Sequence, residues 1–108
     1  MSHHVQLTRS AAADLRELYD FIADTDSPAA ADGVLDRLQA RMQSLSEFPV
    51  RGGHPKELLE LGIRDYRQLV EPPARILYRL HGNRVVIYLI ADSRRDMQRL
   101  LARRLLGG

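Results

Sequence analysis

The sequence contains no cysteine, so the chain can form neither a disulfide nor a thiolate zinc site. It also lacks any apolar run near the roughly 20 residues that a helix needs to cross a bilayer. The N-terminus has no charged region followed by an apolar core, so we expect no secretory signal. These absences predict a cytoplasmic protein with no membrane partner.

Lysine is nearly absent: one of the sixteen basic residues is lysine and the other fifteen are arginine. Residues 1–49 contain four arginines and eight carboxylates, a net charge of −4. Residues 50–108 contain twelve basic residues and six carboxylates, a net charge of +6. Arginine presents a planar fork of donors to carboxylates and phosphates. The basic half therefore predicts an acidic partner: nucleic acid, a nucleoprotein or an acidic protein segment.

Signals for cofactors and metals are also missing. Gly52-Gly53 precedes neither a helix nor the lysine of a phosphate-binding loop, which argues against a nucleotide site. His54 and His81 lie in predicted turns, without a carboxylate or second histidine at ligand spacing. We therefore expect no metal and no cofactor.

The first half predicts a strand followed by two helices. Val5 to Thr8 alternates apolar and polar residues, as a short strand does. Ser10 suits a helix N-cap, and Leu15 to Ile22 repeats at helical spacing. Ser27-Pro28 begins a second helix that extends to about Ser46. The short polar connection between the two helices predicts an antiparallel hairpin.

The second half predicts three strands and a helix. Tyr66–Val70 and Ala74–Leu80 read as strands, the latter with one apolar and one cationic face. Gly82-Asn83 predicts a tight turn before Val85–Ala91, which is apolar on both faces and should be the most buried strand. A helix is expected over Arg94–Leu106. The fold class is thus α+β: an N-terminal strand, an α-helical hairpin, a three-stranded antiparallel meander and a C-terminal helix, in one domain spanning residues 1–108.

Four arginines converge if these elements assemble as expected. Arg67 and Arg75 lie on neighbouring strands, and Arg94 and Arg95 follow the buried strand. A concave face lined by them would bind anions. Alternatively, each holds a strand end by pairing with a carboxylate; the candidates are Asp65, Glu71, Asp92 and Asp96. For the group as a whole we favour binding.

The tyrosines predicted on strands offer a second kind of contact. Tyr66, Tyr78 and Tyr88 fall where tyrosine is favoured for packing, so core or half-core positions are expected. A strand tyrosine can also stack a base, which keeps nucleic acid among the possible partners.

Short segments along the whole chain match a known family in order and spacing. They are Thr8 with Ala12–Leu15, Leu45 with Phe48-Pro49 and Arg51-Gly52, Tyr66-Arg67, Arg75–Arg79, Val85–Ile90, Asp92–Asp96 and Leu100–Leu106. With these segments the chain resembles the RelE/ParE family of toxins from bacterial type II toxin–antitoxin modules. The resemblance implies one of two mechanisms.

RelE-type members cut mRNA in the decoding site of the ribosome. That reaction activates a 2′-hydroxyl and needs a general base, together with cations for the developing charge. The resemblance places Arg67, Arg75 and Arg95 where RelE-type members have catalytic or phosphate-binding cations.

Two positions depart from the RelE pattern. Leu101 stands where a tyrosine in the final helix would be the base, and Leu69 replaces a second cation. Arginine cannot readily act as a base, because its pKa is too high. Tyr78 and His81 are the remaining candidates for a base.

ParE-type members inhibit DNA gyrase and trap its cleaved-DNA complex without hydrolysing anything. Because this chain has cations and no evident base, we predict a ParE-like gyrase inhibitor that is not an enzyme. The alternatives are a ribosome-dependent mRNA endonuclease acting on ribosome-bound mRNA, and a degenerate member that binds only its antitoxin.

A ParD-like antitoxin is the implied partner under each alternative. We expect its C-terminal segment to cover the helical hairpin and the sheet, with its acidic groups on the arginines. Charge reversal at Arg75 and Arg79 should then weaken the complex. The residues expected to bind the target or the antitoxin are Arg67, Arg75, Tyr78, Arg79, Arg94 and Arg95.

Overall fold

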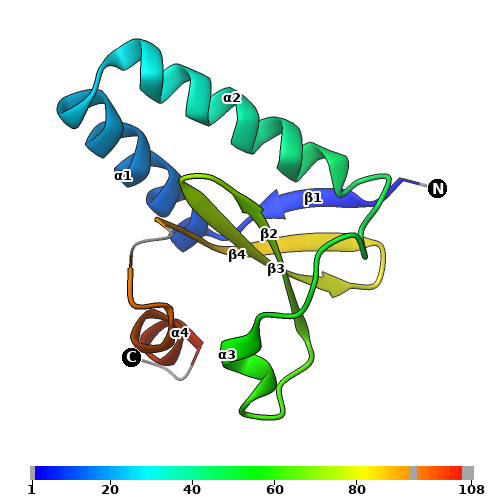
Figure 1. Cartoon of the computed structure of the whole chain (residues 1–108). Helices are drawn as coiled ribbons and strands as arrows, with labels where there is room; N and C mark the ends of the chain where they lie inside the picture. The colour runs from blue at the N-terminus through cyan, green and yellow to red at the C-terminus, as the bar shows by residue number, and fades with distance from the viewer. Residues whose placement is uncertain (1, 93–94, 106–108) are drawn as a thin grey trace.

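The computed structural model describes residues 2–92 and 95–105. Its centre is a four-stranded sheet in the order β1-β4-β3-β2 (Figure 1). β2 (Tyr66–Glu71), β3 (Ala74–His81) and β4 (Arg84–Asp92) form the predicted antiparallel meander. β1 (His4–Leu7) pairs parallel to β4 and so places β4 inside the sheet. The predicted α+β class is confirmed, and the predicted elements occur in the expected order, with one further helix among them.

The helical hairpin consists of α1 (Arg9–Thr25) and α2 (Pro28–Ser44). The Thr8 hydroxyl accepts a hydrogen bond from the Ala11 amide and caps α1. The predicted cap at Ser10 is therefore wrong, because the helix begins one residue before it. Ser27 caps α2 as predicted, by accepting from the Ala30 amide, with Pro28 in the first turn.

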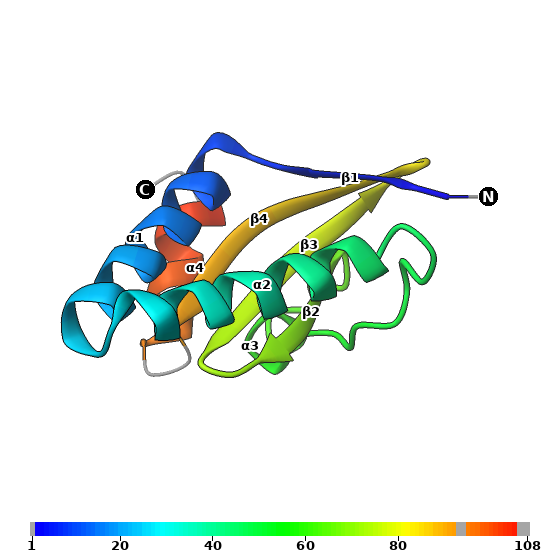
Figure 2. The ribbon, with the colours of Figure 1, turned by 90° about the horizontal axis from the view of Figure 1, so that it is seen from above.

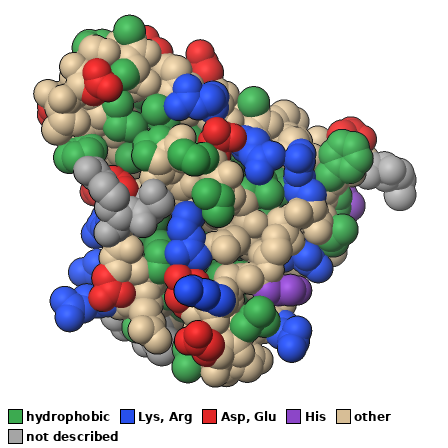
Figure 3. All heavy atoms as spheres, in the orientation of Figure 1, with side chains coloured by type: hydrophobic (Ala, Val, Ile, Leu, Met, Phe, Trp, Pro, Cys, Tyr) green, Lys and Arg blue, Asp and Glu red, His purple; other side chains and the backbone are tan. Residues whose placement is uncertain are grey.

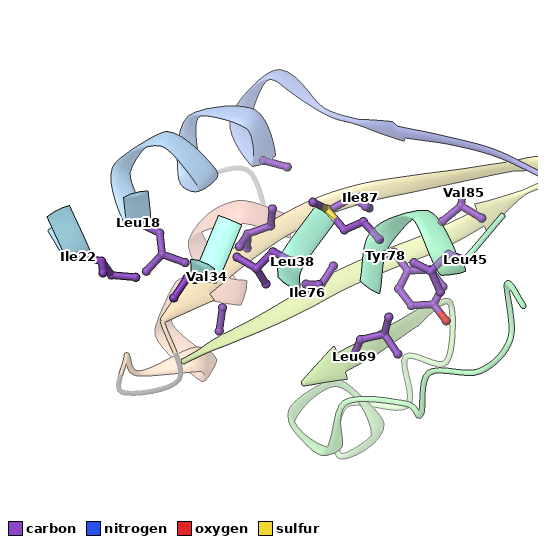
Figure 4. Packing of buried hydrophobic residues seen from close by; sticks show 14 of the residues in the cluster. Leu18, Ile22, Val34, Leu38, Leu45, Leu69, Ile76, Tyr78, Val85 and Ile87 are labelled. Atoms are coloured by element: carbon purple, nitrogen blue, oxygen red, sulfur yellow. The ribbon is translucent and has the colours of Figure 1, made fainter. Parts of the chain in front are cut away.

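The hairpin packs on one face of the sheet and forms the first core. Figure 2 shows α1 and α2 lying over the strands, and Figure 4 shows their apolar side chains directed at the sheet. Leu38 of α2 and Tyr78, Ile76 and Ile87 of the strands are fully buried there.

A second core covers part of the opposite face. It joins a short helix, α3 (Lys56–Leu59), to α4 (Met97–Leu105). Figure 1 shows both helices on the side of the sheet away from the hairpin. The members of this core are Leu58, Leu77, Leu89, Ala91, Met97, Leu100 and Leu101. The sequence pattern did not predict α3, and the expected cationic face of β3 is interrupted by the buried Leu77.

An irregularity in the β3–β4 ladder determines where Tyr88 points. Leu77 pairs with Leu89 and Tyr78 pairs with Ile87, so Tyr88 is an extra residue on β4.

The predicted turn at Gly82-Asn83 is present, and Gly82 has a φ of 63°. Glycine suits this position because other residues rarely adopt a positive φ.

Candidate functional site

Arg67 and Tyr78 hold the loop between α2 and α3. The Arg67 Nη1 donates to the carbonyl oxygens of Val50 (3.2 Å) and Gly52 (2.8 Å). The Tyr78 hydroxyl donates to the Pro49 carbonyl (2.8 Å) and accepts from the Gly52 amide (3.0 Å). Burial raises the pKa of Tyr78 above its ordinary value. Both predicted site residues therefore have structural partners on the side of the sheet that faces the hairpin.

Gly52 permits this close approach. A Cβ at position 52 would lie 2.5 Å from the Gln68 carbonyl oxygen and 2.8 Å from the Tyr78 hydroxyl. The sequence pattern did not predict this requirement. The signal was the first glycine of the Gly52-Gly53 pair.

Arg75 lies on the opposite face of the sheet and connects it to α3. Its guanidinium binds the Glu57 carboxylate through two hydrogen bonds of 2.9 and 3.0 Å, and its Nε donates to Gln68 Oε1 at 2.9 Å. The Arg75 and Glu57 side chains are only 15% and 17% exposed. The hydrogen bonds from Arg75 hold the pKa of Glu57 below its ordinary value. Arg75 thus pairs with a carboxylate that the sequence analysis did not name.

Arg79 belongs to a cluster of half-buried rings near the β3–β4 turn. Its guanidinium carbon lies 5.7 Å from the centre of the Tyr66 ring. The Tyr66 and Tyr88 rings meet edge to face at 5.6 Å. Nε2 of His81 and the Tyr88 hydroxyl are 2.8 Å apart. The prediction that His81 lies in a turn is wrong, because this residue ends β3 and has an aromatic partner.

Arg95 is exposed and lies beside α1, away from Arg67 and Arg75. It lines a hollow of about 250 Å³ whose wall includes Asp14 and Glu17 of α1. A second hollow of about 600 Å³ shares Leu18, Phe21 and Asp92 with the first and continues along the hairpin to Gly33 and Arg37. We call the two hollows together the α1 groove. Its floor is apolar and several carboxylates line it.

A polar contact that the sequence analysis missed closes one end of this region. Asp14 of α1 accepts a hydrogen bond from the Ile90 amide at 3.1 Å and a second from Arg104 of α4. Arg104 also donates to the Tyr88 carbonyl at 3.0 Å. Burial raises the pKa of Asp14, although these hydrogen bonds act in the opposite direction. The sequence places Asp14 and Arg104 too far apart to indicate this pair.

The predicted convergence of arginines on one concave face is not observed. Arg67 faces the hairpin side of the sheet, Arg75 the α3 side, and Arg95 the α1 groove. Arg94 lies outside the described residues. Figure 3 likewise shows basic side chains spread over the visible face with carboxylates between them. The reason is strand geometry: neighbouring positions alternate between faces, and Arg67 and Arg75 each find a different local partner.

The two positions that depart from the RelE pattern are both core positions. Leu101 is 2% exposed in the second core and Leu69 is 5% exposed in the first. Within residues 2–92 and 95–105, no group of three or more histidine and acidic side chains is placed to hold a metal ion. None of the helices in the same residues is long and apolar enough to cross a membrane.

Comparison with known proteins agrees with this fold. Residues 5–97 match the family model described as the ParE toxin of the type II toxin–antitoxin system parDE. The chain is 30% identical to Toxin ParE3 of Caulobacter vibrioides over 97 residues, which cover 90% of this chain and 93% of that protein.

Two solved structures share the architecture. One is a chain of the chromosomal ParDE system from P. aeruginosa, with a TM-score of 0.71, 26% identity and coverage of 84% of this chain and 96% of that one. The other is a chain of the RelBE2 toxin–antitoxin complex from Mycobacterium tuberculosis, with a TM-score of 0.56, 22% identity and coverage of 85% and 99%. The second likeness shows the fold alone. The family model and the curated relative together establish that this chain belongs to the ParE toxin family of type II toxin–antitoxin systems.

Proposed function

We propose that this toxin acts by binding DNA gyrase and not by hydrolysing a substrate. The proposal rests on the burial and the hydrogen-bond partners of the residues that a RelE-type ribonuclease would use. The Tyr78 hydroxyl is buried and has two backbone partners, and Leu101 is buried where a base would be. A general base must reach the proton that it removes. Tyr78 cannot do so without opening the loop that it holds.

The arginines support the same proposal. A ribonuclease would need Arg67, Arg75 and Arg95 around one phosphate, whereas they occupy three different surroundings. A gyrase inhibitor needs a complementary surface only. Similarity to ParE-type chains, the ParE3 toxin among them, supports gyrase as the target.

We further propose a ParD-like antitoxin as the partner, with the α1 groove as its docking surface. The groove has an apolar floor, and Phe21 at its centre is 44% exposed. An antitoxin segment with an apolar anchor would bury this ring and offset the entropy of its own ordering. Because the exposed Glu17 carboxylate lines the groove, the segment should also carry a basic residue.

This docking surface revises where the antitoxin's charges would lie. The family resemblance predicts acidic antitoxin groups on Arg75 and Arg79. Arg75 already has the Glu57 carboxylate as its partner, so a second carboxylate would gain little there. Arg79 remains available for such a contact, and a comparison of variants at the two surfaces decides between them.

The decisive experiment is a cleavage assay with purified gyrase, supercoiled plasmid, ATP and the chain freed of antitoxin. Linear DNA recovered after detergent and protease treatment is the expected result, with mRNA intact in a parallel translation reaction. Unchanged plasmid together with codon-phased mRNA cuts would overturn the proposal.

One observation favours the ribonuclease as the second candidate. His81 of β3 and Tyr88 of β4 form a hydrogen-bonded pair 2.8 Å apart, and Arg79 lies two residues before His81 on β3. Such a pair could move a proton if mRNA reached it. If the translation reaction does yield cuts, the His81→Ala and Tyr88→Phe variants should abolish them and Tyr78→Phe should not.

A further inference from the structure

One end of the sheet face that carries α4 is not covered by a helix. Figures 1 and 2 show α4 beneath the end of the sheet where β4 finishes, with the β3–β4 turn at the other end. Val85 and Ile87 point into the first core, so the side chains that alternate with them point to the uncovered side. Cross-strand pairing extends this surface over all four strands. We call it the open face; its residues are His4, Gln6, Tyr66, Arg79, His81, Arg84, Val86 and Tyr88.

The open face combines cations with half-buried aromatic rings. Arg79 pairs with Tyr66 across the β2–β3 ladder and lies over its ring. His81 pairs with Arg84 across the β3–β4 ladder, and Arg84 is exposed. Tyr88, the extra residue of the ladder, adds its ring to the edge of Tyr66. The irregularity in β4 therefore brings the second tyrosine to this surface.

The charge of the open face has one sign. It carries two arginines and two histidines, and none of its residues is acidic. Among the described residues, no ion pair joins Arg79 or Arg84 to a carboxylate. Arg75, by contrast, is neutralised by Glu57. Arg79 and Arg84 thus remain available to an anion from outside the chain.

We propose that the open face binds single-stranded nucleic acid. Unpaired bases would stack on the exposed parts of the Tyr66 and His81 rings, and Arg79 and Arg84 would bind the phosphates between them. Aromatic side chains on a sheet surface suit single strands because the bases of a duplex are already stacked on one another. This binding goes beyond gyrase inhibition and requires neither gyrase nor an antitoxin.

The test is fluorescence anisotropy of the purified chain with labelled oligothymidine about 12 nucleotides long, titrated at several salt concentrations. Replacing both arginines by glutamine (Arg79→Gln with Arg84→Gln) should lower the affinity at least tenfold at low salt. The slope of log affinity against log salt should fall by about 1.4, because each lost phosphate contact contributes about 0.7 for a single strand. The matched control, Arg9→Gln with Arg16→Gln, removes two exposed arginines of α1 and should change neither quantity.

A second variant tests the stacking separately. Tyr66→Leu keeps an apolar contact with the second core and removes the aromatic ring. We expect an affinity about tenfold lower with an unchanged salt slope. Circular dichroism of each variant verifies that the fold is retained.

Three further ligands complete the test. Oligouridine of the same length distinguishes RNA from DNA as the ligand. Stronger binding of oligouridine than of oligothymidine supports the proposal with RNA as the ligand, and equal or weaker binding supports it with DNA. Equal binding of a duplex would overturn the proposal, since it would indicate general attraction to phosphate. Equal binding of oligoglutamate would also overturn it, in favour of an acidic protein partner. Because gyrase is absent, failure here leaves the gyrase proposal standing.

Discussion

Arg104 of α4 contacts the Asp14 carboxylate of α1 across ninety positions of sequence. The same carboxylate accepts from the Ile90 amide of β4, so one side chain connects two helices and the sheet. Asp14 is partly buried, and its removal would leave Arg104 with only the Tyr88 carbonyl as an acceptor among these contacts. The contact is therefore the principal polar link between α4 and the hairpin among the described residues.

Removing that carboxylate should destabilise the fold. Asp14→Ala leaves the Arg104 guanidinium and the Ile90 amide without this partner, and we expect a loss of about 2 kcal/mol in the free energy of unfolding. Urea denaturation measures this loss. Asp24→Ala, which removes an exposed carboxylate of the same helix, is the control and should change the value by less than about 0.5 kcal/mol. Equal stability of the two variants would contradict the structural role of Asp14.

The Arg75–Glu57 pair should make stability depend on pH. Because Arg75 lowers the pKa of Glu57 in the folded state, the unfolded chain takes up a proton first as the pH falls. The stabilisation is therefore complete above the ordinary pKa of glutamate and is lost as the pH drops through the lower, folded value. Glu57→Gln should unfold more easily than the wild type near pH 7, and the difference should shrink below about pH 4.5. Urea midpoints of both proteins between pH 3 and 7 test this; a constant difference would contradict it.

The two adjacent glycines of the α2–α3 loop should respond differently to alanine. Gly52→Ala would force a methyl group against the Gln68 carbonyl and the Tyr78 hydroxyl, and we expect a cost of about 1–3 kcal/mol. Gly53→Ala meets no atom within 4 Å and is the matched control. Thermal melting of the two variants should show a lower Tm for Gly52→Ala alone. A similar decrease in both would mean that the Tyr78–Gly52 contact does not govern the loop.

The chain's two phenylalanines offer a matched test of the antitoxin surface. Phe21 is 44% exposed in the α1 groove, and Phe48 is 63% exposed after α2. If the antitoxin docks in the groove, Phe21→Ser should weaken the complex at least tenfold, because the ring is then lost as an anchor, whereas Phe48→Ser should have little effect. Calorimetric titration with the antitoxin measures both affinities.

Charge reversal locates the antitoxin surface independently of the phenylalanine variants. Glu17→Arg changes the sign of an exposed groove residue, and Arg79→Glu does so on the open face. A loss of affinity confined to Glu17→Arg would support the groove. A loss confined to Arg79→Glu would instead indicate that the antitoxin's acidic groups bind the open face.

The local elements follow from residues close together in the chain. Ser27-Pro28 begins α2 because a capping hydroxyl and a fixed φ act within one turn. Gly82-Asn83 forms the β3–β4 turn for an equally local reason. The apolar run of Val85–Ala91 predicts a buried strand. The position of β4 between β1 and β3 agrees with that prediction. The family resemblance rests on the same local segments and is confirmed.

The candidate site was harder to predict, because its contacts join residues that are distant in sequence. Tertiary packing, and not spacing, decides that Arg75 pairs with Glu57 and that Arg104 pairs with Asp14. The helix α3 spans only four residues, which are too few for a periodic pattern. It gains its stability from Leu58 in the second core.

By itself, the sequence determined the strands and the helices other than α3, the charge of each half and the family. The tertiary structure alone decided which arginines are already neutralised and which remain available on a surface. The physical reason is range: caps, turns and hydrophobic periodicity act within a few residues, whereas charge pairing depends on which distant side chains the sheet and helices bring together.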